Sequence, residues 1–207
     1  VFDKWNEDMS QERKPGQPGT LYLIPCPIAE DTPVWDVLPA ANRAVIDSLD
    51  YFIVENVRSA RRFLSKAGIG RPIDSLEFRE LNEHTTDARA VDEMVRPILA
   101  GRSAGVISEA GVPGVADPGA LAVARCHRLG IRVVPLIGPS SIILAVMASG
   151  LNGQSFAFNG YLPVKPPAPQ QRIGDFLHIV DGGDHEHPLL LHLVDAALRR
   201  CKRGGTE

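Results

Sequence analysis

Short apolar runs alternate with amphipathic segments from residue 21 onward. Four runs have the length and aliphatic content of buried strands, at residues 21–24, 51–54, 104–107 and 131–136. Between and after them the apolar spacing predicts helices at residues 34–49, 59–67, 87–100, 119–129 and 141–149. Because strand and helix alternate, the right-handed crossover rule favours an α/β fold with an open parallel sheet.

Turn residues support these bounds. Thr86 and Asp87 can cap the third predicted helix, and Gly101 and Gly130 stand where left-handed residues commonly end helices. Pro39 falls inside the first predicted helix, so we expect a kink or a late start there.

The chain divides into three predicted parts. Residues 1–20 are polar and lack the apolar core of a signal peptide, so we interpret them as a mobile leader with Met9 as a candidate start. Residues 21–150 form the α/β domain. Residues 151–207 form the start of a second, incomplete α/β domain, in which 155–162 alternate like an edge strand and the proline-rich 163–169 mark a boundary.

Composition excludes several classes of protein. With 44% hydrophobic and 23% charged residues the chain is globular, and its net charge of −3 argues against nucleic-acid binding by bulk electrostatics, although a local basic patch is allowed. Three distant cysteines without a CxxC pair indicate neither a disulfide framework nor a zinc site, which fits a reducing cytoplasm. No apolar run is long enough to read as a membrane span.

The loops that follow the predicted strands are the candidate site, because ligands collect at the carboxyl ends of strands in an open parallel sheet. The first loop, residues 25–31, contains two prolines that fix a rigid corner. The second places Glu55 and Arg58 at the end of a buried strand. These two can serve chemistry, or form a structural ion pair, or Glu55 can cap a helix.

The third and fourth loops have the composition of a ligand site. Residues 108–119 contain three glycines and two prolines, which let the backbone approach a ligand while its shape is held. Neither GxxxxGK[ST] nor GxGxxG is present, so a nucleoside without phosphates is favoured over a nucleotide. The fourth loop ends with Ser140 and Ser141, whose hydroxyls can receive a carboxylate or simply cap the helix that follows.

Six strings carry a resemblance to a known family. In order they are LYLIPCPIAED (21–31), FIVENVRSARRFL (52–64), LNEH (81–84), VISEAGVPGVADPG (106–119), VPLIGPSSIILAVMASGL (134–151) and FAFNGYLPVK (156–165). Together they resemble the tetrapyrrole methylase superfamily of S-adenosylmethionine-dependent methyltransferases. The most similar branch methylates a ribose 2′-oxygen of a cytidine in small-subunit ribosomal RNA.

The resemblance implies a two-domain α/β enzyme, usually a homodimer, that binds S-adenosylmethionine between its domains and needs no metal. Its acceptor would be ribosomal RNA in the small subunit. By motif, eight residues would line the cofactor site: Pro27, Ile28, Glu109, Ala110, Gly111, Pro113, Ser140 and Ser141.

Removal of the 2′-hydroxyl proton calls for a positioned base, and Glu55 and Glu83 are the candidates. We rank Glu55 first because it ends a sheet strand. Arg58 and Asn82 are candidate substrate-binding residues. Arg58 begins a basic helix face that can hold RNA phosphates or simply be solvated, and Asn82 can read a base edge or close a turn.

The chain departs from the family pattern within these loops. Residues 26–30 are Cys-Pro-Ile-Ala-Glu where the family has Thr-Pro-Ile-Gly-Asn, so Ala29 would reshape the first loop if that position needs a positive φ. Residues 55–58 are Glu-Asn-Val-Arg where the family has Glu-Asp-Thr-Arg. Residues 108–114 are Ser-Glu-Ala-Gly-Val-Pro-Gly where the family has Ser-Asp-Ala-Gly-Thr-Pro-Gly. The family also has a complete second domain where this sequence keeps some forty residues, so we expect either a shortened, impaired product or a partner that supplies the rest.

Other functions remain open at this point. A tetrapyrrole or another small molecule can be the methyl acceptor, and a non-catalytic relic or dimerisation module can keep the same fold. A nucleotide-dependent kinase or dehydrogenase is disfavoured by the missing phosphate motifs. The histidines of the tail invite a metal hypothesis, but in the alternating His-Glu-His run at 185–187 neighbouring side chains would fall on opposite faces of a strand, whereas a metal site needs convergent ligands. They are His178, His185, His187 and His192.

Overall fold

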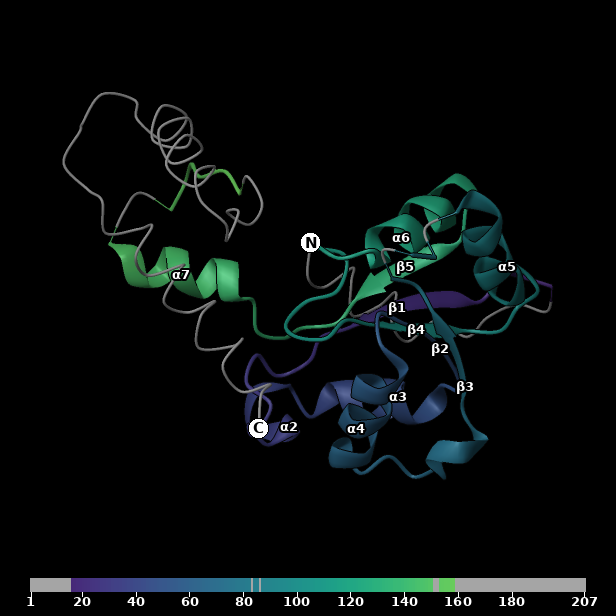
Figure 1. The fold of residues 1–207 in the computed structure, drawn as a ribbon, viewed down its shortest axis with the longest axis horizontal. Helices are drawn as coiled ribbons and strands as arrows, with labels where there is room; N and C mark the ends of the chain where they lie inside the picture. The colour runs from purple at the N-terminus through teal and green to yellow at the C-terminus, as the bar shows by residue number, and fades with distance from the viewer. Residues whose placement is uncertain (1–15, 83, 86, 151–152, 159–207) are drawn as a thin grey trace. The chain divides into compact units, whose positions relative to one another are not determined.

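A computed structural model describes residues 16–82, 84–85, 87–150 and 153–158 (Figure 1). The chain divides into two compact units. One unit consists of Val1–Cys26 with Pro33–Gly138, and the other of Pro27–Thr32 with Pro139–Glu207. The sheet and most helices belong to the first unit.

The first unit holds a five-stranded sheet whose pairs are all parallel, in the order β3-β2-β4-β1-β5. The strands are β1 (Thr20–Ile24), β2 (Tyr51–Val54), β3 (Glu77–Glu80), β4 (Ala104–Ile107) and β5 (Arg132–Pro135). The helices are α2 (Val34–Val37), α3 (Ala41–Ser48), α4 (Val57–Ala67), the 3-10 helix η1 (Ile73–Ser75), α5 (Ala88–Leu99) and α6 (Gly119–Arg128). The predicted α/β fold with a parallel sheet is confirmed.

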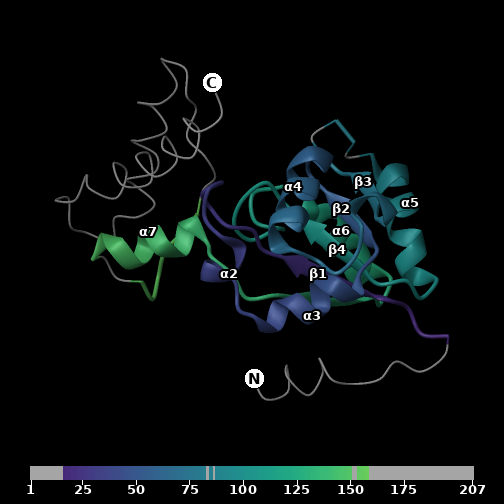
Figure 2. The ribbon, with the colours of Figure 1, turned by 90° about the horizontal axis from the view of Figure 1, so that it is seen from below.

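Helices cover both faces of the sheet (Figures 1 and 2). Alternate residues of a strand point to opposite faces, so Phe52 and Val54 of β2 pack with α3 and α4, whereas Tyr51 and Ile53 pack with α5 and α6. All four side chains are fully or almost fully buried. The strands therefore read as continuous apolar runs rather than as alternating patterns.

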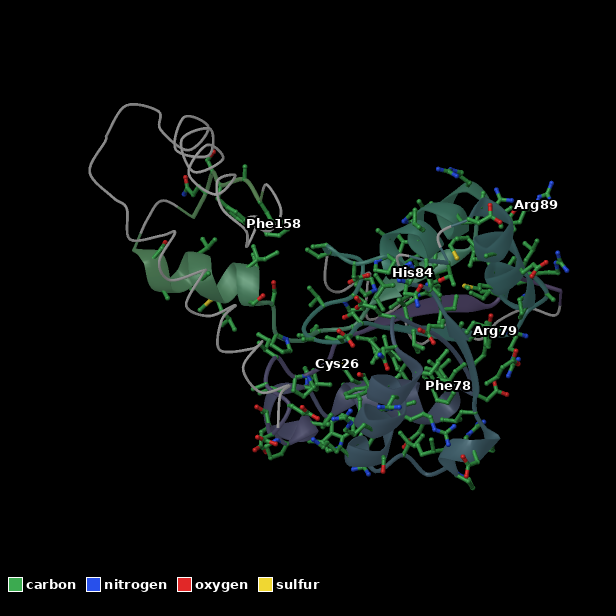
Figure 3. The ribbon with its side chains drawn as sticks, viewed as in Figure 1. Cys26, Phe78, Arg79, His84, Arg89 and Phe158 are labelled. Atoms are coloured by element: carbon green, nitrogen blue, oxygen red, sulfur yellow. The ribbon has the colours of Figure 1, made fainter. Side chains whose placement is uncertain are left out.

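The edge strand β3 was not predicted from the sequence. Three of its four residues are charged, and its only hydrogen-bonded neighbour in the sheet is β2. Phe78 and Arg79 point to opposite sides of β3 (Figure 3). Phe78 stacks on Phe52 with ring centroids 5.7 Å apart. Glu77 accepts a hydrogen bond of 2.6 Å from Arg102, which also binds Asp50 and so ties this edge to the start of β4.

Helix bounds follow local chemistry. The single helix predicted at residues 34–49 is interrupted, because Pro39 lies between α2 and α3. Helix α4 begins two residues earlier than expected because Asn56 caps it, accepting a 3.1 Å hydrogen bond from the amide of Ser59. Gly101 and Gly130 both have positive φ, at 103° and 66°, directly after the C-terminal cap residues of α5 and α6.

Two predicted helix and strand features are wrong. Asp87 precedes α5 but its side chain makes no capping hydrogen bond, and Thr86 lies outside the described residues. Residues 155–158, the described part of the predicted edge strand, form no strand.

The proposed leader up to residue 15, with Met9, and the tail from residue 159, with its histidines, also lie outside the described residues. Among the helices that the structure describes, none has the length and apolarity to cross a membrane.

The second unit contributes one described helix, α7 (Ser141–Ser149), at the predicted bounds. Ser140 caps it by accepting a hydrogen bond from the amide of Ile143 at 3.5 Å. It ends at Gly150, which has a φ of 71°.

The centre of the sheet has no room for a side chain at Gly105. A Cβ at this position of β4 would lie 2.5 Å from Cδ1 of Ile24 and 2.9 Å from Cδ1 of Phe52, both fully buried. We expect Gly105→Ala to lower the free energy of unfolding by about 1–3 kcal/mol, the usual cost of overpacking a core. Urea denaturation of the purified chain measures it.

Gly70→Ala is the matched control, because a Cβ at Gly70 meets no atom within 4 Å. This control should unfold like the wild type. Equal stability of Gly105→Ala and the wild type would show that the contact between β1, β2 and β4 has spare room.

Candidate functional site

The end of β1 is joined to the loop after β4 by a two-residue bridge. The amide of Cys26 donates to the carbonyl of Gly111 at 2.8 Å, and the amide of Gly111 donates back to the carbonyl of Cys26 at 3.2 Å. The Cys26 thiol donates to the carbonyl of Ser108 at 3.6 Å. Burial raises the pKa of Cys26 to about 12, so the thiol stays protonated and serves as a small hydrogen-bond donor rather than a nucleophile.

Glu55 directly follows β2, and its side chain reaches the same loop. Its Oε2 accepts a 3.2 Å hydrogen bond from the amide of Glu109, and its own amide donates to the carbonyl of Ile107 at 3.2 Å. Burial is the main cause that raises the pKa of Glu55, and the charges of Glu109 and Asp117 raise it further, against the hydrogen bond from Glu109. The ion pair with Arg58 that the sequence left open is not among the contacts of the described residues.

Asp117 closes the far end of the loop, and the sequence analysis did not single it out. Its carboxylate accepts from the amide of Gly114, 3.0 Å from Oδ1 and 2.8 Å from Oδ2, and from the amide of Gly119 at 2.7 Å. Gly114 has a φ of 84° and Ala116 a φ of 60°. A signal was present, since an Asp between a glycine-rich turn and a helix start is suited to bind nearby amides.

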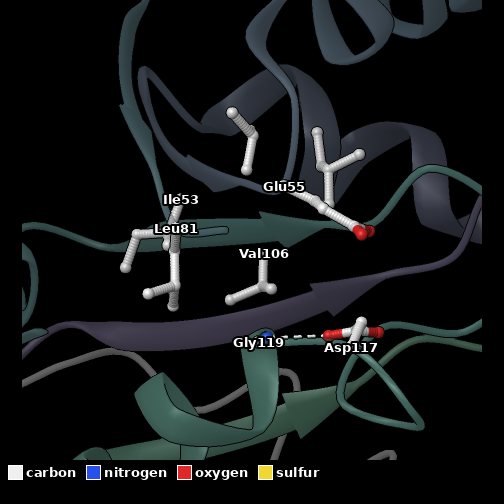
Figure 4. Close-up of a pocket in the computed structure, with 8 residues that line it drawn as sticks. Ile53, Glu55, Leu81, Val106, Asp117 and Gly119 are labelled. Atoms are coloured by element: carbon white, nitrogen blue, oxygen red, sulfur yellow. Dashed lines mark hydrogen bonds between the residues drawn. The ribbon is translucent and has the colours of Figure 1, made fainter. Parts of the chain in front are cut away.

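Glu55 and Asp117 face a small hollow beside the sheet (Figure 4). Gly119 lies at its rim, and the remaining lining is apolar: Ile53, Val54, Leu81, Val106 and Ile107. The volume of the hollow that a water-sized molecule can occupy is about 0 Å³, whereas ordinary ligand pockets measure roughly 300–1,000 Å³. The hollow by itself therefore has no room for a ligand.

Many backbone amides of loop 108–119 already donate hydrogen bonds within the protein. The amides of Glu109, Gly111, Gly114 and Gly119 all donate to protein groups. A phosphate cradle depends on such amides pointing at the ligand. This loop is therefore better suited to a ligand that presents few anionic groups, as its composition predicted.

The structure places the eight predicted cofactor residues in two sets. Four lie in the tethered loop of the first unit, namely Glu109, Ala110, Gly111 and Pro113, and the other four belong to the second unit, namely Pro27, Ile28, Ser140 and Ser141. The capping alternative for the hydroxyl of Ser140 is confirmed by its bond to Ile143. Ala29 is not strained, because Ala116 is the one described non-glycine residue with a positive φ.

The predicted substrate residues are in separate surroundings. Asn82 closes a turn: its Nδ2 donates to Glu80 at 2.8 Å, its Oδ1 accepts from the amide of His84 at 3.0 Å, and its amide donates to Oγ1 of Thr85 at 2.8 Å. The second predicted base, Glu83, lies outside the described residues.

Arg58 lies in the first turn of α4. On the same helix Arg61 forms an ion pair with Asp74 and lies 5.8 Å from the ring centroid of Phe78, so this part of the basic face has partners within the protein. No cluster of metal-ligating side chains occurs in the part of the chain that the structure describes.

Comparison with curated proteins identifies relatives that share one name. A protein of Xylella fastidiosa, "Ribosomal RNA small subunit methyltransferase I", is 34% identical over 161 residues, which are 78% of this chain and 55% of the relative. Its namesake in Vibrio cholerae is 35% identical over 153 residues, 74% of this chain and 50% of the relative. Over the matched residues the chain is similar in sequence to these methyltransferases.

The resemblance to the tetrapyrrole methylase superfamily, and within it to the small-subunit ribosomal RNA branch, is thus confirmed. A protein of this name in Halalkalibacterium halodurans is 33% identical over 145 residues, which are 70% of this chain and 47% of the relative. The chain spans about half the length of the curated relatives it matches. A search against family models gave no match.

The raised pKa of Glu55 predicts a pH-dependent effect on stability. A carboxyl whose pKa is higher in the folded than in the unfolded state destabilises the fold above that folded pKa, and the effect vanishes below the unfolded value of about 4.5. Glu55→Gln, which keeps an oxygen for the Glu109 amide, should therefore raise the melting temperature at pH 7 by roughly 1–2 °C. Thermal unfolding at pH 7 and at pH 4 measures the difference, which should disappear at the lower pH.

Glu93→Gln, an exposed change on α5, is the control and should shift neither curve. A lower melting temperature of Glu55→Gln at pH 7 would mean that the bond from Glu109 outweighs the burial of the charge.

Proposed function

We propose that this chain is part or all of an S-adenosylmethionine-dependent methyltransferase that acts on a ribose 2′-hydroxyl of small-subunit ribosomal RNA. The observation that supports it most is the loop 108–119, which is tethered at the carboxyl edge of the sheet beside a half-buried carboxylate, in a chain whose relatives carry that methyltransferase name. A small-molecule acceptor has no comparable support.

The residues present fit the cofactor. Loop 108–119 uses many of its amides internally, which suits an uncharged adenosine and a methionine tail better than phosphates. In this proposal the residues of loop 108–119 that contact the cofactor are Glu109, Ala110, Gly111 and Pro113. By motif, four further residues are proposed cofactor residues: Pro27, Ile28, Ser140 and Ser141. When bound, S-adenosylmethionine supplies a methyl group on a positively charged sulfur, and the transfer needs no metal.

Glu55 is the proposed general base. One of its oxygens is tethered to the Glu109 amide, which fixes the carboxyl group, and Oε1 has no hydrogen-bond partner among the described residues. Burial and the two neighbouring acids raise the pKa of Glu55, which makes its carboxylate a stronger proton acceptor. In this role Oε1 would accept the proton that the 2′-hydroxyl loses when its oxygen takes the methyl group from sulfur, and S-adenosylhomocysteine would leave.

The remaining predictions complete the proposal. Arg58 contributes positive charge toward RNA phosphates, and Glu83 is a second candidate base. Asn82 is already committed to its turn, so its proposed role is to hold the segment next to the substrate rather than to read a base. The partners are the small ribosomal subunit and a second copy of the chain in a homodimer. A ribosomal substrate would place the reaction in the cytoplasm.

Methyl transfer from tritium-labelled S-adenosylmethionine to isolated small subunits tests the proposal. The wild-type chain should label ribosomal RNA at a ribose, and Glu55→Gln should reduce the rate by roughly 10²–10⁴-fold, the usual contribution of a positioned base. Binding of S-adenosylhomocysteine, measured by calorimetry, should not change in this variant, because the tether to Glu109 can be kept by the amide oxygen.

Glu93→Gln again serves as the control and should methylate at the wild-type rate. Labelling of a porphyrinoid in place of the subunit would overturn the RNA assignment. A Glu55→Gln variant as fast as the wild type would remove Glu55 from the proton transfer and direct attention to Glu83.

A further inference from the structure

We propose that Asp117 is a positioning residue for the methyl-donor loop: it sets the affinity for the donor by holding the backbone between Gly111 and Gly119 in its binding shape. The inference rests on the proposed function, since it assumes that this loop receives the donor. Asp117 itself would act through the backbone, without a role in proton transfer.

The contacts of Asp117 point inward to the loop. Oδ1 accepts from the amides of both Gly114 and Gly119, and Oδ2 accepts a second contact from Gly114 at 2.8 Å. One side chain thus holds amides on both sides of itself in sequence, which folds residues 114–119 around it.

The backbone held by Asp117 includes conformations that L-residues seldom adopt. Ala116, next to it, has a φ of 60°, and Gly114 has a φ of 84°. A non-glycine residue in the left-handed region is strained and persists only where its surroundings impose it. The carboxylate supplies that constraint, because hydrogen bonds to a charged acceptor are about twice as strong as those between neutral groups.

Gly119 is small because the carboxylate occupies the space beside it. A Cβ on Gly119 would lie 2.7 Å from Oδ1 of Asp117 and 3.0 Å from Cγ1 of Val106. Gly119 is the first residue of α6, where alanine is by itself a better helix former than glycine. Gly119→Ala therefore displaces the carboxylate without removing its charge.

The other end of the loop is held independently. Glu55 binds the amide of Glu109, and the Cys26 bridge fixes Gly111. Residues 112–116, which connect these contacts to α6, depend on Asp117 for their attachment. Loss of the hydrogen bonds to Asp117 should therefore make the Pro113 side of the proposed cofactor site more mobile, while residues 109–111 stay in place.

Two variants of the full chain test the proposal, with S-adenosylhomocysteine as the probe in calorimetry. In the wild type both carboxylate oxygens of Asp117 accept hydrogen bonds from backbone amides. Asp117→Asn replaces one of these oxygens with an amide nitrogen, which cannot accept from the backbone N–H that it faces. We expect Asp117→Asn and Gly119→Ala each to raise the Kd for S-adenosylhomocysteine by about tenfold or more. The reason is that each variant weakens the hydrogen bonds between the loop amides and a charged acceptor. Amide hydrogen exchange should become faster at residues 114–116 in both variants.

Asp92→Asn is the matched control. Asp92 of α5 binds Arg125 of α6 through both carboxylate oxygens, so its loss weakens the same helix without touching the loop. It should lower stability in urea and leave the Kd unchanged. This separates a positioning role from a general loss of stability.

The outcomes distinguish this inference from the function on which it rests. Tight binding to the wild type with an unchanged Kd in both loop variants would overturn the role of Asp117 alone. A wild-type chain that binds no S-adenosylhomocysteine at millimolar concentration would overturn the methyl-donor site itself.

Discussion

The arrangement of the loops depends on the common direction of the strands. Because all pairs in the sheet are parallel, β1, β2 and β4 end at one edge, and the segments that follow them meet there. The backbone of the glycine-rich segment after β4 must then satisfy its amides beside three strand ends. Three residues satisfy these amides. Cys26 binds the segment from the end of β1, Glu55 binds it from the end of β2, and Asp117 binds it from within the segment itself.

The same arrangement concentrates negative charge. Glu55, Glu109 and Asp117 lie close enough for the charges of the latter two to raise the pKa of the first, and no described arginine or lysine neutralises that effect. This repulsion destabilises the fold, whereas the hydrogen bonds that fix the loop stabilise it. Charge that is retained at a cost in a partly buried position is commonly linked to function.

Much of the fold was predictable from the sequence because its signals are local. Aliphatic runs gave four of the five strands, and Pro39, Gly101 and Gly130 marked breaks that the structure contains. The strand β3 was not predictable in this way. Its sequence, Glu-Phe-Arg-Glu, is mostly charged, and it is held by tertiary contacts with β2 and Arg102 that no local pattern reveals.

The candidate site was predictable only at the level of loops. Strand ends and glycine content indicated segments 25–31, 55–58 and 108–119, but they did not reveal which side chain binds which amide. The sequence left open an ion pair between Glu55 and Arg58 as one alternative, whereas the hydrogen-bond partner of the Glu55 carboxylate in the fold is the amide of Glu109, 54 positions away. Asp117 was missed because its role lies in backbone contacts across a turn.

The thiol at position 26 bears on how this protein withstands oxidants. The form of cysteine that peroxide attacks is the thiolate, and a group with a pKa of about 12 is in that form in only about one molecule in 10⁵ at neutral pH. The side chain is also 4% exposed. A sulfur atom at the junction of two loops therefore carries little redox liability, and the junction keeps its shape where an accessible cysteine would be converted to a sulfenic acid.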